Sequence, residues 1–335
     1  NFLIDEEVVQ RIVAAAELSE DDTVLEVGPG IGTLTQGLAQ SGARVVAVEL
    51  DKRLLPVLAK TLEGYDNVRI ESGDILEVDI KNIVGAPTFK VAANLPYYIT
   101  TPIIFNLLEQ RLPMERLVAM VQKEVAERMV AQPGGKDYGA LSVSIQYYTE
   151  PEIAFIVPPQ SFIPAPNVDS AVIVCKRRTV PPVEVCDEKL FFKVVKAAFS
   201  VRRKMLSNAL KNMGISSVQA AAWLERAGID PKRRGETLSL ADFASLTNCF
   251  KEVLAETEAV KIIKGKMPMK KIAVLRCLRT SNNCTGSGCL KAFNNKTNAF
   301  AVYEAEETEL AAFLNCSGCG DVQMPNSEEG LRKKL

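Results

Sequence analysis

The feature that most constrains this chain is an alternation of short β-rich runs and helical stretches. After a helix predicted over residues 5–17, the β-rich runs cover 23–27, 43–48, 67–71, 89–93 and 117–121, and helix-like segments occupy 33–40, 52–63, 101–110 and 123–131. Strands that alternate with helices in this way predict a doubly wound, Rossmann-like α/β fold around a parallel sheet. The runs at 141–148 and 168–175 have little helix between them, so we expect an antiparallel hairpin at the sheet edge.

The pattern changes near Thr179, where Pro181 and Pro182 interrupt the chain. We therefore place the α/β domain at 1–178 and expect a small all-helical domain at 179–257. Its predicted helices cover 188–199, 203–213, 217–227 and 239–256. Trp223 is expected in the core of this helical domain.

A third pattern follows a basic linker at 258–270. Residues 271–277 resemble a new first strand, so we expect 271–335 to be the opening of another α/β domain, only partly present. Five of the eight cysteines lie there, at Cys277, Cys284, Cys289, Cys316 and Cys319. We see no export signal, so a reducing cytoplasm is the expected location, and the cluster is interpreted as metal-binding or redox-active rather than disulfide-bonded. No run of 18 apolar residues occurs, so we expect no membrane span.

Histidine is absent from all 335 residues. Its absence excludes Ser-His-Asp triads, Cys-His nucleophiles, histidine-ligated zinc and imidazole acid–base catalysis. Any chemistry must therefore use carboxylates, amides, hydroxyls, thiols, backbone groups or a cofactor. The formal net charge of −1 hides three basic clusters, at 176–178, 202–204 and 232–234, which fit either a solvated surface or a nucleic-acid-binding patch.

A glycine-rich turn joins the first β-rich run to the helix at 33–40. Gly28, Gly30 and Gly32 allow the backbone to approach a ligand closely at a helix N-terminus. Their Gly-x-Gly-x-Gly spacing departs from the dinucleotide fingerprint, and Glu26 just before the turn would repel a pyrophosphate. A carboxylate here instead suits S-adenosylmethionine, which carries a sulfonium and an ammonium group. A tight turn without a ligand is the alternative interpretation.

Two further acids follow the next strands. Glu49 ends the second β-rich run and can accept both hydroxyls of a ribose, while Asp74 follows the third and can accept the amine of an adenine. Either acid alone would be an ordinary surface residue. Because ligands of open α/β sheets bind outside the carboxyl ends of the strands, acids at successive strand ends indicate a site for S-adenosylmethionine.

The segment Asn94-Leu95-Pro96-Tyr97 follows the fourth β-rich run. Adenine N6 is a weak nucleophile because its lone pair is delocalised into the ring. The side-chain carbonyl of Asn94 and the backbone carbonyl of Leu95 can accept both N6 hydrogens and aim the lone pair at a methyl group. Pro96 stiffens the turn, and Tyr97 can stack on an extruded base. An Asx turn leading into the next helix is the alternative interpretation.

Together with residues 1–5, these motifs resemble those of the ribosomal RNA adenine dimethyltransferases, most closely the bacterial small-subunit group. The resemblance includes the segments 122–128, 158–172 and 198–206 and covers roughly residues 1–256. It implies a class I methyltransferase sheet, S-adenosylmethionine as cofactor, and dimethylation of N6 on two adjacent adenines in the 3′-terminal hairpin of small-subunit rRNA. It also implies a role in ribosome biogenesis, with the pre-30S particle as partner, and we expect a monomer.

The same resemblance implies roles for single residues. Those expected to bind the cofactor, with the first two closing over it, are Asn1, Leu3, Gly28, Gly30, Glu49, Asp74 and Asn94. Those expected to hold the target adenine are Asn94, Leu95, Tyr97 and, on its other face, Phe162.

The basic segment Arg202-Arg203-Lys204 is expected to contact rRNA phosphates from the start of a helix. The apolar positions of that helix, which would pack inward, are Met205, Leu206, Ala209 and Leu210.

The cysteine-rich segment resembles the start of a metal-binding domain named for its Cys-Gly-Gly-Cys motif. Here the motif at 316–319 is Cys-Ser-Gly-Cys, and the rest of the domain is absent. We expect zinc or iron to bind weakly or not at all. A regulatory domain and a fused reading frame with no role in methylation fit equally well.

Three other functions deserve comparison. A large-subunit rRNA adenine methyltransferase of the antibiotic-resistance type would share fold and chemistry, but segment 199–206 favours the small-subunit group. A non-enzymatic RNA-binding assembly factor would not need the intact Asn94 segment or the complete set of acids. A nicotinamide oxidoreductase is disfavoured by the glycine spacing and by the absence of histidine.

Overall fold

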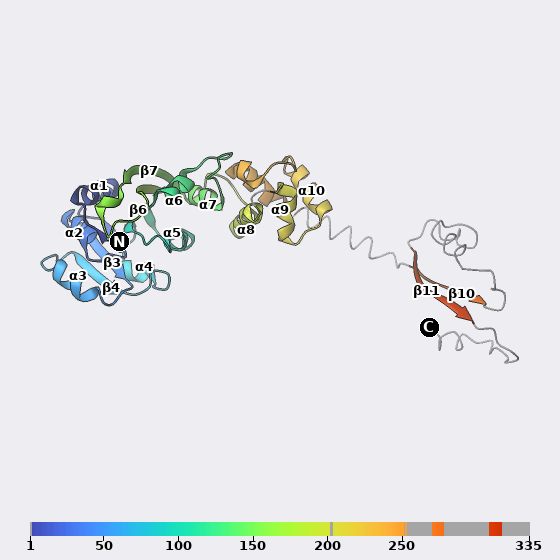
Figure 1. Cartoon of the computed structure of the whole chain (residues 1–335), viewed down its shortest axis with the longest axis horizontal. Helices are drawn as coiled ribbons and strands as arrows, with labels where there is room; N and C mark the ends of the chain where they lie inside the picture. The colour runs from blue at the N-terminus through green and yellow to red at the C-terminus, as the bar shows by residue number, and fades with distance from the viewer. Residues whose placement is uncertain (1, 202–203, 251, 253–269, 278–307, 317–335) are drawn as a thin grey trace. The chain divides into compact units, whose positions relative to one another are not determined.

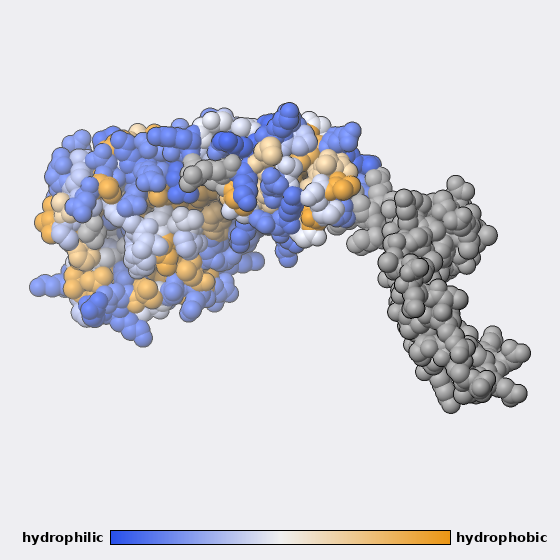
Figure 2. All heavy atoms as spheres, turned by 45° about the vertical axis from the view of Figure 1, so that its right-hand side comes forward, coloured by the Kyte–Doolittle hydropathy of each residue, from blue (hydrophilic) through white to orange (hydrophobic). Residues whose placement is uncertain are grey.

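The computed structural model describes residues 2–201, 204–250 and 252, together with the backbone of 270–277 and 308–316 (Figure 1). The chain divides into two units, Asn1–Val253 and Leu254–Leu335, which are described separately. Hydrophilic side chains cover most of the visible face of the first unit, and apolar side chains appear there in small scattered groups (Figure 2). In the described part of the chain, no helix is both long enough and apolar enough to cross a lipid bilayer.

A seven-stranded sheet forms the centre of the first unit, in the order β4-β3-β2-β5-β6-β9-β7. Its strands are β2 (Thr23–Val27), β3 (Arg44–Glu49), β4 (Val68–Ser72), β5 (Phe89–Asn94), β6 (Met114–Gln122), β7 (Thr149–Val157) and β9 (Ser170–Arg177). Strands β2 to β6 pair in parallel, whereas β9 pairs antiparallel with both β6 and β7. The predicted doubly wound sheet is confirmed. Its order reverses between β2 and β5, which is where such folds bind ligands.

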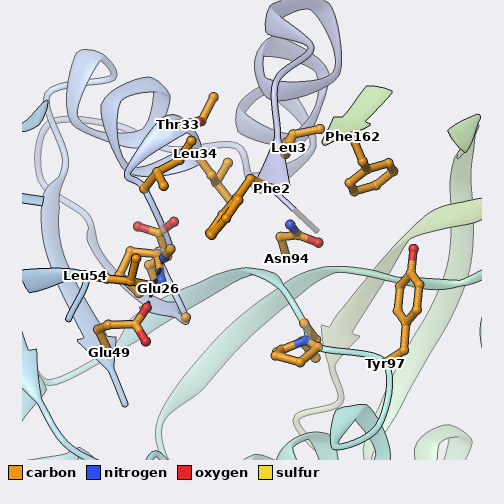
Figure 3. Close-up of a pocket in the computed structure, with 16 residues that line it drawn as sticks. Phe2, Leu3, Glu26, Thr33, Leu34, Glu49, Leu54, Asn94, Tyr97 and Phe162 are labelled. Atoms are coloured by element: carbon orange, nitrogen blue, oxygen red, sulfur yellow. Dashed lines mark hydrogen bonds between the residues drawn. The ribbon is translucent and has the colours of Figure 1, made fainter. Parts of the chain in front are cut away.

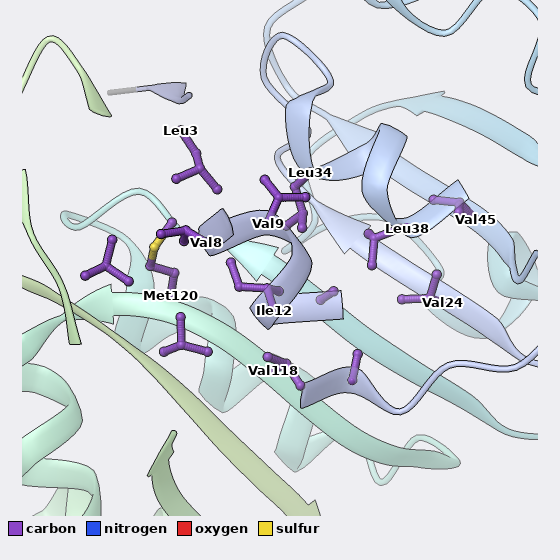
Figure 4. Packing of buried hydrophobic residues seen from close by; sticks show 14 of the residues in the cluster. Leu3, Val8, Val9, Ile12, Val24, Leu34, Leu38, Val45, Val118 and Met120 are labelled. Carbon is purple, nitrogen blue, oxygen red and sulfur yellow. The ribbon is translucent and has the colours of Figure 1, made fainter. Parts of the chain in front are cut away.

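Seven helices of the described chain accompany this sheet. They are α1 (Glu6–Ala16), α2 (Thr33–Gln40), α3 (Leu55–Thr61), α4 (Ile80–Val84), α5 (Thr100–Glu109), α6 (Lys123–Val130) and α7 (Ala140–Tyr148). Apolar side chains of α1 pack on the sheet in a buried cluster that includes Ile12, Val118 and Met120 (Figure 4). Helices α1 and α2 approach closely because Gly37 has no side chain; a Cβ there would collide with Val9.

One strand prediction is wrong. Residues 141–148 form helix α7, and the hairpin instead pairs β7, which begins at Thr149, with β9. Apolar residues alternate with Ser142, Ser144 and Gln146, which is the pattern of a strand with one solvent-exposed face. In the structure Ser142 and Ser144 are buried, and the Ser142 hydroxyl donates to the Arg128 carbonyl at 2.5 Å. Because both kinds of position are buried, the alternation does not report a solvent-facing side.

Two very short strands lie outside the main sheet. Strand β1 (Phe2–Leu3) pairs antiparallel with β8 (Phe162–Ile163), which follows the 3₁₀ turn η1 (Pro159–Ser161). The backbone N–H of Ile4 donates to the Ser161 carbonyl at 3.0 Å. The start of the chain is thereby held against a segment about 160 residues away.

The helical region begins with α8 (Glu188–Phe199) and continues with α9 (Leu206–Ala209), η2 (Leu210–Met213), α10 (Ser217–Arg226), η3 (Gly235–Thr237) and a helix over 240–250. Trp223 is fully buried and donates from Nε1 to the Leu246 carbonyl at 2.7 Å, which confirms its expected place in the core. Met205 was expected to pack inward, but it precedes α9 and is 45% exposed.

In the second unit the structure describes two strands, β10 (Lys270–Cys277) and β11 (Thr308–Cys316). They pair in parallel, and Cys277 is the register partner of Cys316. A strand over 271–277 is therefore confirmed, whereas Cys284, Cys289 and Cys319 lie outside the described residues.

Candidate active site

A pocket of about 240 Å³ lies at the carboxyl ends of β2, β3 and β5 (Figure 3). Eight of the residues expected to bind cofactor or adenine line it: Leu3, Gly28, Gly30, Glu49, Asn94, Leu95, Tyr97 and Phe162. Asn1 lies outside the described residues, and Asp74 does not line the pocket. The structure thus brings most of the predicted set into one cavity.

We call Glu26, Glu49 and the glycine turn the carboxylate side of this pocket, and Asn94, Leu95, Tyr97 and Phe162 its aromatic side. The turn begins after β2, where the N–H of Gly28 donates to the Val48 carbonyl at 3.0 Å. Gly28 and Gly30 have φ values of +70° and +62°, which residues with a side chain rarely adopt. The turn therefore requires glycine at these two positions.

Glu49 is the fixed carboxylate of the pocket. It ends β3 and is only 6% exposed. Its Oε2 accepts from the Gly30 N–H at 3.0 Å, and its Oε1 accepts from the Asp51 N–H at 2.8 Å. Each carboxylate oxygen can accept more than one hydrogen bond, so Glu49 keeps acceptor capacity toward the pocket.

Glu26 lies beside Glu49 and has a different environment. It is 1% exposed, and its Oε2 has no hydrogen-bond partner among the described residues. Burial and the nearby charge of Glu49 together raise the pKa of Glu26 to about 8. A buried acid without a partner is costly, so this oxygen is suited to a cationic or hydrogen-bond-donating ligand.

Asp74 has a local role in the structure. Its Oδ1 accepts from the Leu76 N–H at 2.9 Å, and its carbonyl accepts from Glu77 and Val78. The carboxylate therefore caps the turn that leads toward α4. Its expected contact with an adenine amine stays a prediction.

The aromatic side is built on the turn after β5. The Leu95 N–H donates to the Met120 carbonyl at 3.1 Å and its side chain is buried, which ties the turn to β6. Among the described residues, no hydrogen bond engages the half-buried side chain of Asn94. Its amide group is therefore available to a ligand.

Tyr97 and Phe162 come from segments far apart in the chain. Figure 3 places both rings on the side of Asn94 away from Glu49. The Tyr97 hydroxyl forms a 2.6 Å hydrogen bond with the Ser170 hydroxyl at the start of β9, and Phe162 lies on β8. The two rings can therefore bound a flat ligand next to Asn94.

Sequence reasoning gave no role to several lining residues, most clearly Phe2. Its ring lies over Gly30, where an added Cβ would meet ring atoms at 3.2 and 3.3 Å. Thr33, Leu34 and Leu54 also line the pocket. Phe2 belongs to the segment 1–5 that supports the family resemblance, but nothing in its local spacing indicates that it reaches the glycine turn.

The three basic clusters differ in their surroundings. In the first, the Arg177 guanidinium lies 5.1 Å from the centre of the Tyr148 ring, and Arg178 donates to the carbonyls of Gln146 and Thr149. In the third, Arg233 pairs with Asp242 at 3.1 Å. These three arginines therefore support the fold itself. In the second cluster Lys204 is exposed, and Arg202 and Arg203 lie outside the described residues.

Metal ligation by the five late cysteines stays a prediction. Only Cys277 and Cys316 fall on described backbone, as register partners of β10 and β11. Within the described residues, no group of three or more cysteine, aspartate or glutamate side chains is arranged to hold a metal ion.

Most of the chain is similar in sequence to proteins of known families. Residues 1–252 match the model of a family described as ribosomal RNA adenine dimethylase, and residues 271–334 match that of the CGGC domain. The chain is 52% identical over 257 residues to the ribosomal RNA small subunit methyltransferase A of Geobacillus thermodenitrificans, covering 74% of this chain and 88% of that protein. It is 51% identical over 256 residues to the protein of that name from Moorella thermoacetica, covering 74% and 89%.

Two solved structures are also similar. A dimethyladenosine transferase from Plasmodium falciparum has a TM-score of 0.66 at 26% identity, over 76% of this chain and 98% of that one. The 23S rRNA methyltransferase ErmE has a TM-score of 0.58 at 28% identity, over 75% and 100%. Each match covers nearly the whole length of the solved structure and about three quarters of this chain.

Proposed function

Because the chain belongs to the ribosomal RNA adenine dimethylase family, we propose that its targets are two adjacent adenines in the 3′-terminal hairpin of small-subunit rRNA. The chain is an S-adenosylmethionine-dependent rRNA adenine dimethyltransferase of ribosome biogenesis. Each target adenine would receive two methyl groups on N6. The small-subunit substrate is favoured over a large-subunit one because the chain is 52% identical to the small subunit methyltransferase A of Geobacillus thermodenitrificans and 28% identical to the 23S rRNA methyltransferase ErmE.

One observation carries the enzymatic role. The pocket holds a buried carboxylate side next to an aromatic side whose Asn94 amide is free among the described residues. A protein that only bound RNA would not need to place these two sides within one cavity. This arrangement supports methyl transfer over the non-enzymatic alternative.

On the carboxylate side, Glu49 would accept the ribose hydroxyls of S-adenosylmethionine, and the glycine turn would lie against its methionine part. The orphaned Oε2 of Glu26 fits a ligand that carries positive charge. Leu3 and Asn1 would close over the cofactor, and Asp74 would accept its adenine amine. When bound, S-adenosylmethionine supplies an electrophilic methyl group on its sulfonium.

On the aromatic side, Tyr97 and Phe162 would stack on the two faces of the target adenine. Asn94 Oδ1 and the Leu95 carbonyl would accept the two N6 hydrogens. These two carbonyl dipoles would stabilise the positive charge that N6 gains on methylation. N6 then loses one proton to solvent, so the reaction needs no histidine or other side-chain base.

Away from the pocket, Arg202, Arg203 and Lys204 would bind rRNA phosphates. We propose that the protein acts as a monomer on the pre-30S particle in the cytoplasm. For the second unit, we propose that its cysteines hold zinc or iron weakly or not at all. Stoichiometric metal that stays with the full chain through gel filtration in the presence of a chelator would contradict this.

A substrate comparison tests the proposed function. The full chain is incubated with labelled S-adenosylmethionine and either small subunits that lack dimethyladenine or free large-subunit rRNA. We expect label only in the small subunit, recovered as dimethyladenine. Label in large-subunit rRNA would favour the antibiotic-resistance type, and cofactor binding without transfer to any RNA would favour an assembly factor.

A further inference from the structure

Ser170 carries a buried hydroxyl that forms a hydrogen bond with Tyr97, a residue of the pocket wall. It is the first residue of β9 and is fully buried. The residues that follow it in the strand, Ala171, Val172 and Ile173, are apolar and equally buried. A hydroxyl in such surroundings is unfavourable unless it forms a hydrogen bond, and its partner is the Tyr97 hydroxyl at 2.6 Å.

The position of Ser170 is fixed by the sheet. Strand β9 lies between β6 and β7, and Ser170 is the register partner of Gln122 on one side and of Val157 on the other. Its backbone is therefore constrained from both directions. A hydroxyl on this residue is a stationary anchor for whatever binds it.

Tyr97, by contrast, lies on an exposed turn. Pro96 is exposed, and Tyr98 is 84% exposed. The Ile99 N–H donates to the Pro96 carbonyl at 3.1 Å, which closes the turn without contacting the Tyr97 ring. Tyr97 itself is half-buried and lines the pocket. Its hydroxyl is anchored by the hydrogen bond to Ser170.

We infer that Ser170 is a positioning residue, which holds the Tyr97 ring in the plane that stacks on the target base. This inference rests on the proposed function. Stacking needs only an aromatic ring, which phenylalanine would supply equally well. The tyrosine hydroxyl is then explained as the group that links the ring to β9 and limits its rotation before the substrate arrives.

The test uses the full chain with Ser170→Ala, Tyr97→Phe and the double variant. Each single variant removes the same hydrogen bond, so each should lower the single-turnover rate at saturating cofactor by about three- to ten-fold. The double variant should be no slower than the slower single variant. Because neither atom faces the carboxylate side, affinity for S-adenosylmethionine should be unchanged.

A direct readout of stacking separates positioning from stability. With 2-aminopurine at the target position of the RNA, the protein-induced fluorescence change should fall equally in both single variants. Ser142→Ala serves as a matched control. Like Ser170, Ser142 is buried, but its hydroxyl donates to the Arg128 carbonyl and does not contact Tyr97. It should lower the melting temperature without changing the fluorescence or the rate.

Independent, multiplicative losses in the double variant would overturn the inference, as would a Ser170→Ala protein with wild-type rate and fluorescence. A loss of cofactor affinity that matches the loss of rate would also contradict it, because that indicates a general structural defect. If the wild-type protein methylates no RNA, the proposed function fails instead, and the two failures are therefore distinguishable.

Discussion

The two sides of the pocket are built in opposite ways. On the carboxylate side, Glu49 is buried and both of its oxygens accept backbone N–H groups, so the sheet fixes it before any ligand binds. On the aromatic side, Asn94 has no internal side-chain partner among the described residues, and Tyr97 and Phe162 come from a turn and a two-residue strand. The carboxylate that would bind the cofactor is therefore fixed in advance. On the aromatic side the Tyr97 ring is anchored at its hydroxyl by Ser170, whereas the Asn94 amide would gain its partner only when the base binds.

The largest loss of methyl transfer is expected from a substitution on the aromatic side. Asn94→Ala removes an acceptor for the reacting amine, so methyl transfer should fall by about a thousand-fold or more. Affinity for S-adenosylmethionine should stay within a few-fold of wild type, measured by calorimetry. Unchanged transfer would show that Asn94 does not hold the amine.

The next largest loss, in cofactor affinity, is expected from a substitution on the carboxylate side. Glu49→Gln weakens the contacts to the ribose hydroxyls and to the Gly30 N–H, so cofactor affinity should fall by about a hundred-fold. Glu71→Gln is the matched control, because Glu71 lies on the neighbouring strand β4 and does not line the pocket. Equal losses in the two variants would indicate a long-range charge effect instead of a contact.

The pH dependence of binding sharpens the comparison. With a pKa of about 8, Glu26 in the free protein keeps its proton at neutral pH, and a cationic ligand must displace it. Affinity for S-adenosylmethionine should therefore rise by about 25-fold between pH 6.5 and 8.5 and level off above the pKa. S-adenosylhomocysteine lacks the sulfonium charge and should show a weaker rise, and Glu26→Gln should flatten both curves. An equally steep rise in the Gln variant would rule out Glu26 as the titrating group.

The smallest loss is expected from the contact between Asp5 and Ser161, which joins the segment whose Phe2 ring lies over Gly30 to the segment that carries Phe162. Asp5 caps α1, and its Oδ2 accepts from the Ser161 hydroxyl at 2.7 Å, next to the strand that carries Phe162. Asp5→Ala should cost about 1 kcal/mol of stability and lower both cofactor affinity and transfer by about two- to five-fold. Ser216→Ala removes a comparable cap at α10 and should lower stability alone. Loss on only one side of the pocket in the Asp5 variant would contradict the link.

Much of the carboxylate side was predictable from sequence. Parallel strands place their carboxyl ends along one edge, so the glycine turn and Glu49 were expected to converge once the strands were recognised. Asn94 was predicted for the same reason, since it ends β5. In these cases the position of each residue along a strand contains the needed information.

The remainder depends on contacts that local patterns do not encode. The pairing of β1 with β8 and the bond from Tyr97 to Ser170 join residues far apart in the chain, and neither has a spacing that predicts it. The sequence pattern of α7 predicts a strand because most of its side chains are buried, polar ones included, so no exposed face marks it as a helix. The unpartnered oxygen of Glu26 depends on atomic geometry within the pocket.

The most direct test of the two-sided pocket measures cofactor affinity and single-turnover transfer together, in Glu49→Gln and Asn94→Ala. Raising the S-adenosylmethionine concentration to saturation should restore most of the transfer rate in the Glu49 variant. It should restore none in the Asn94 variant, whose cofactor site is already filled. Rescue of the Asn94 variant by cofactor, or no rescue of the Glu49 variant at full occupancy, would contradict the division of roles proposed for this site.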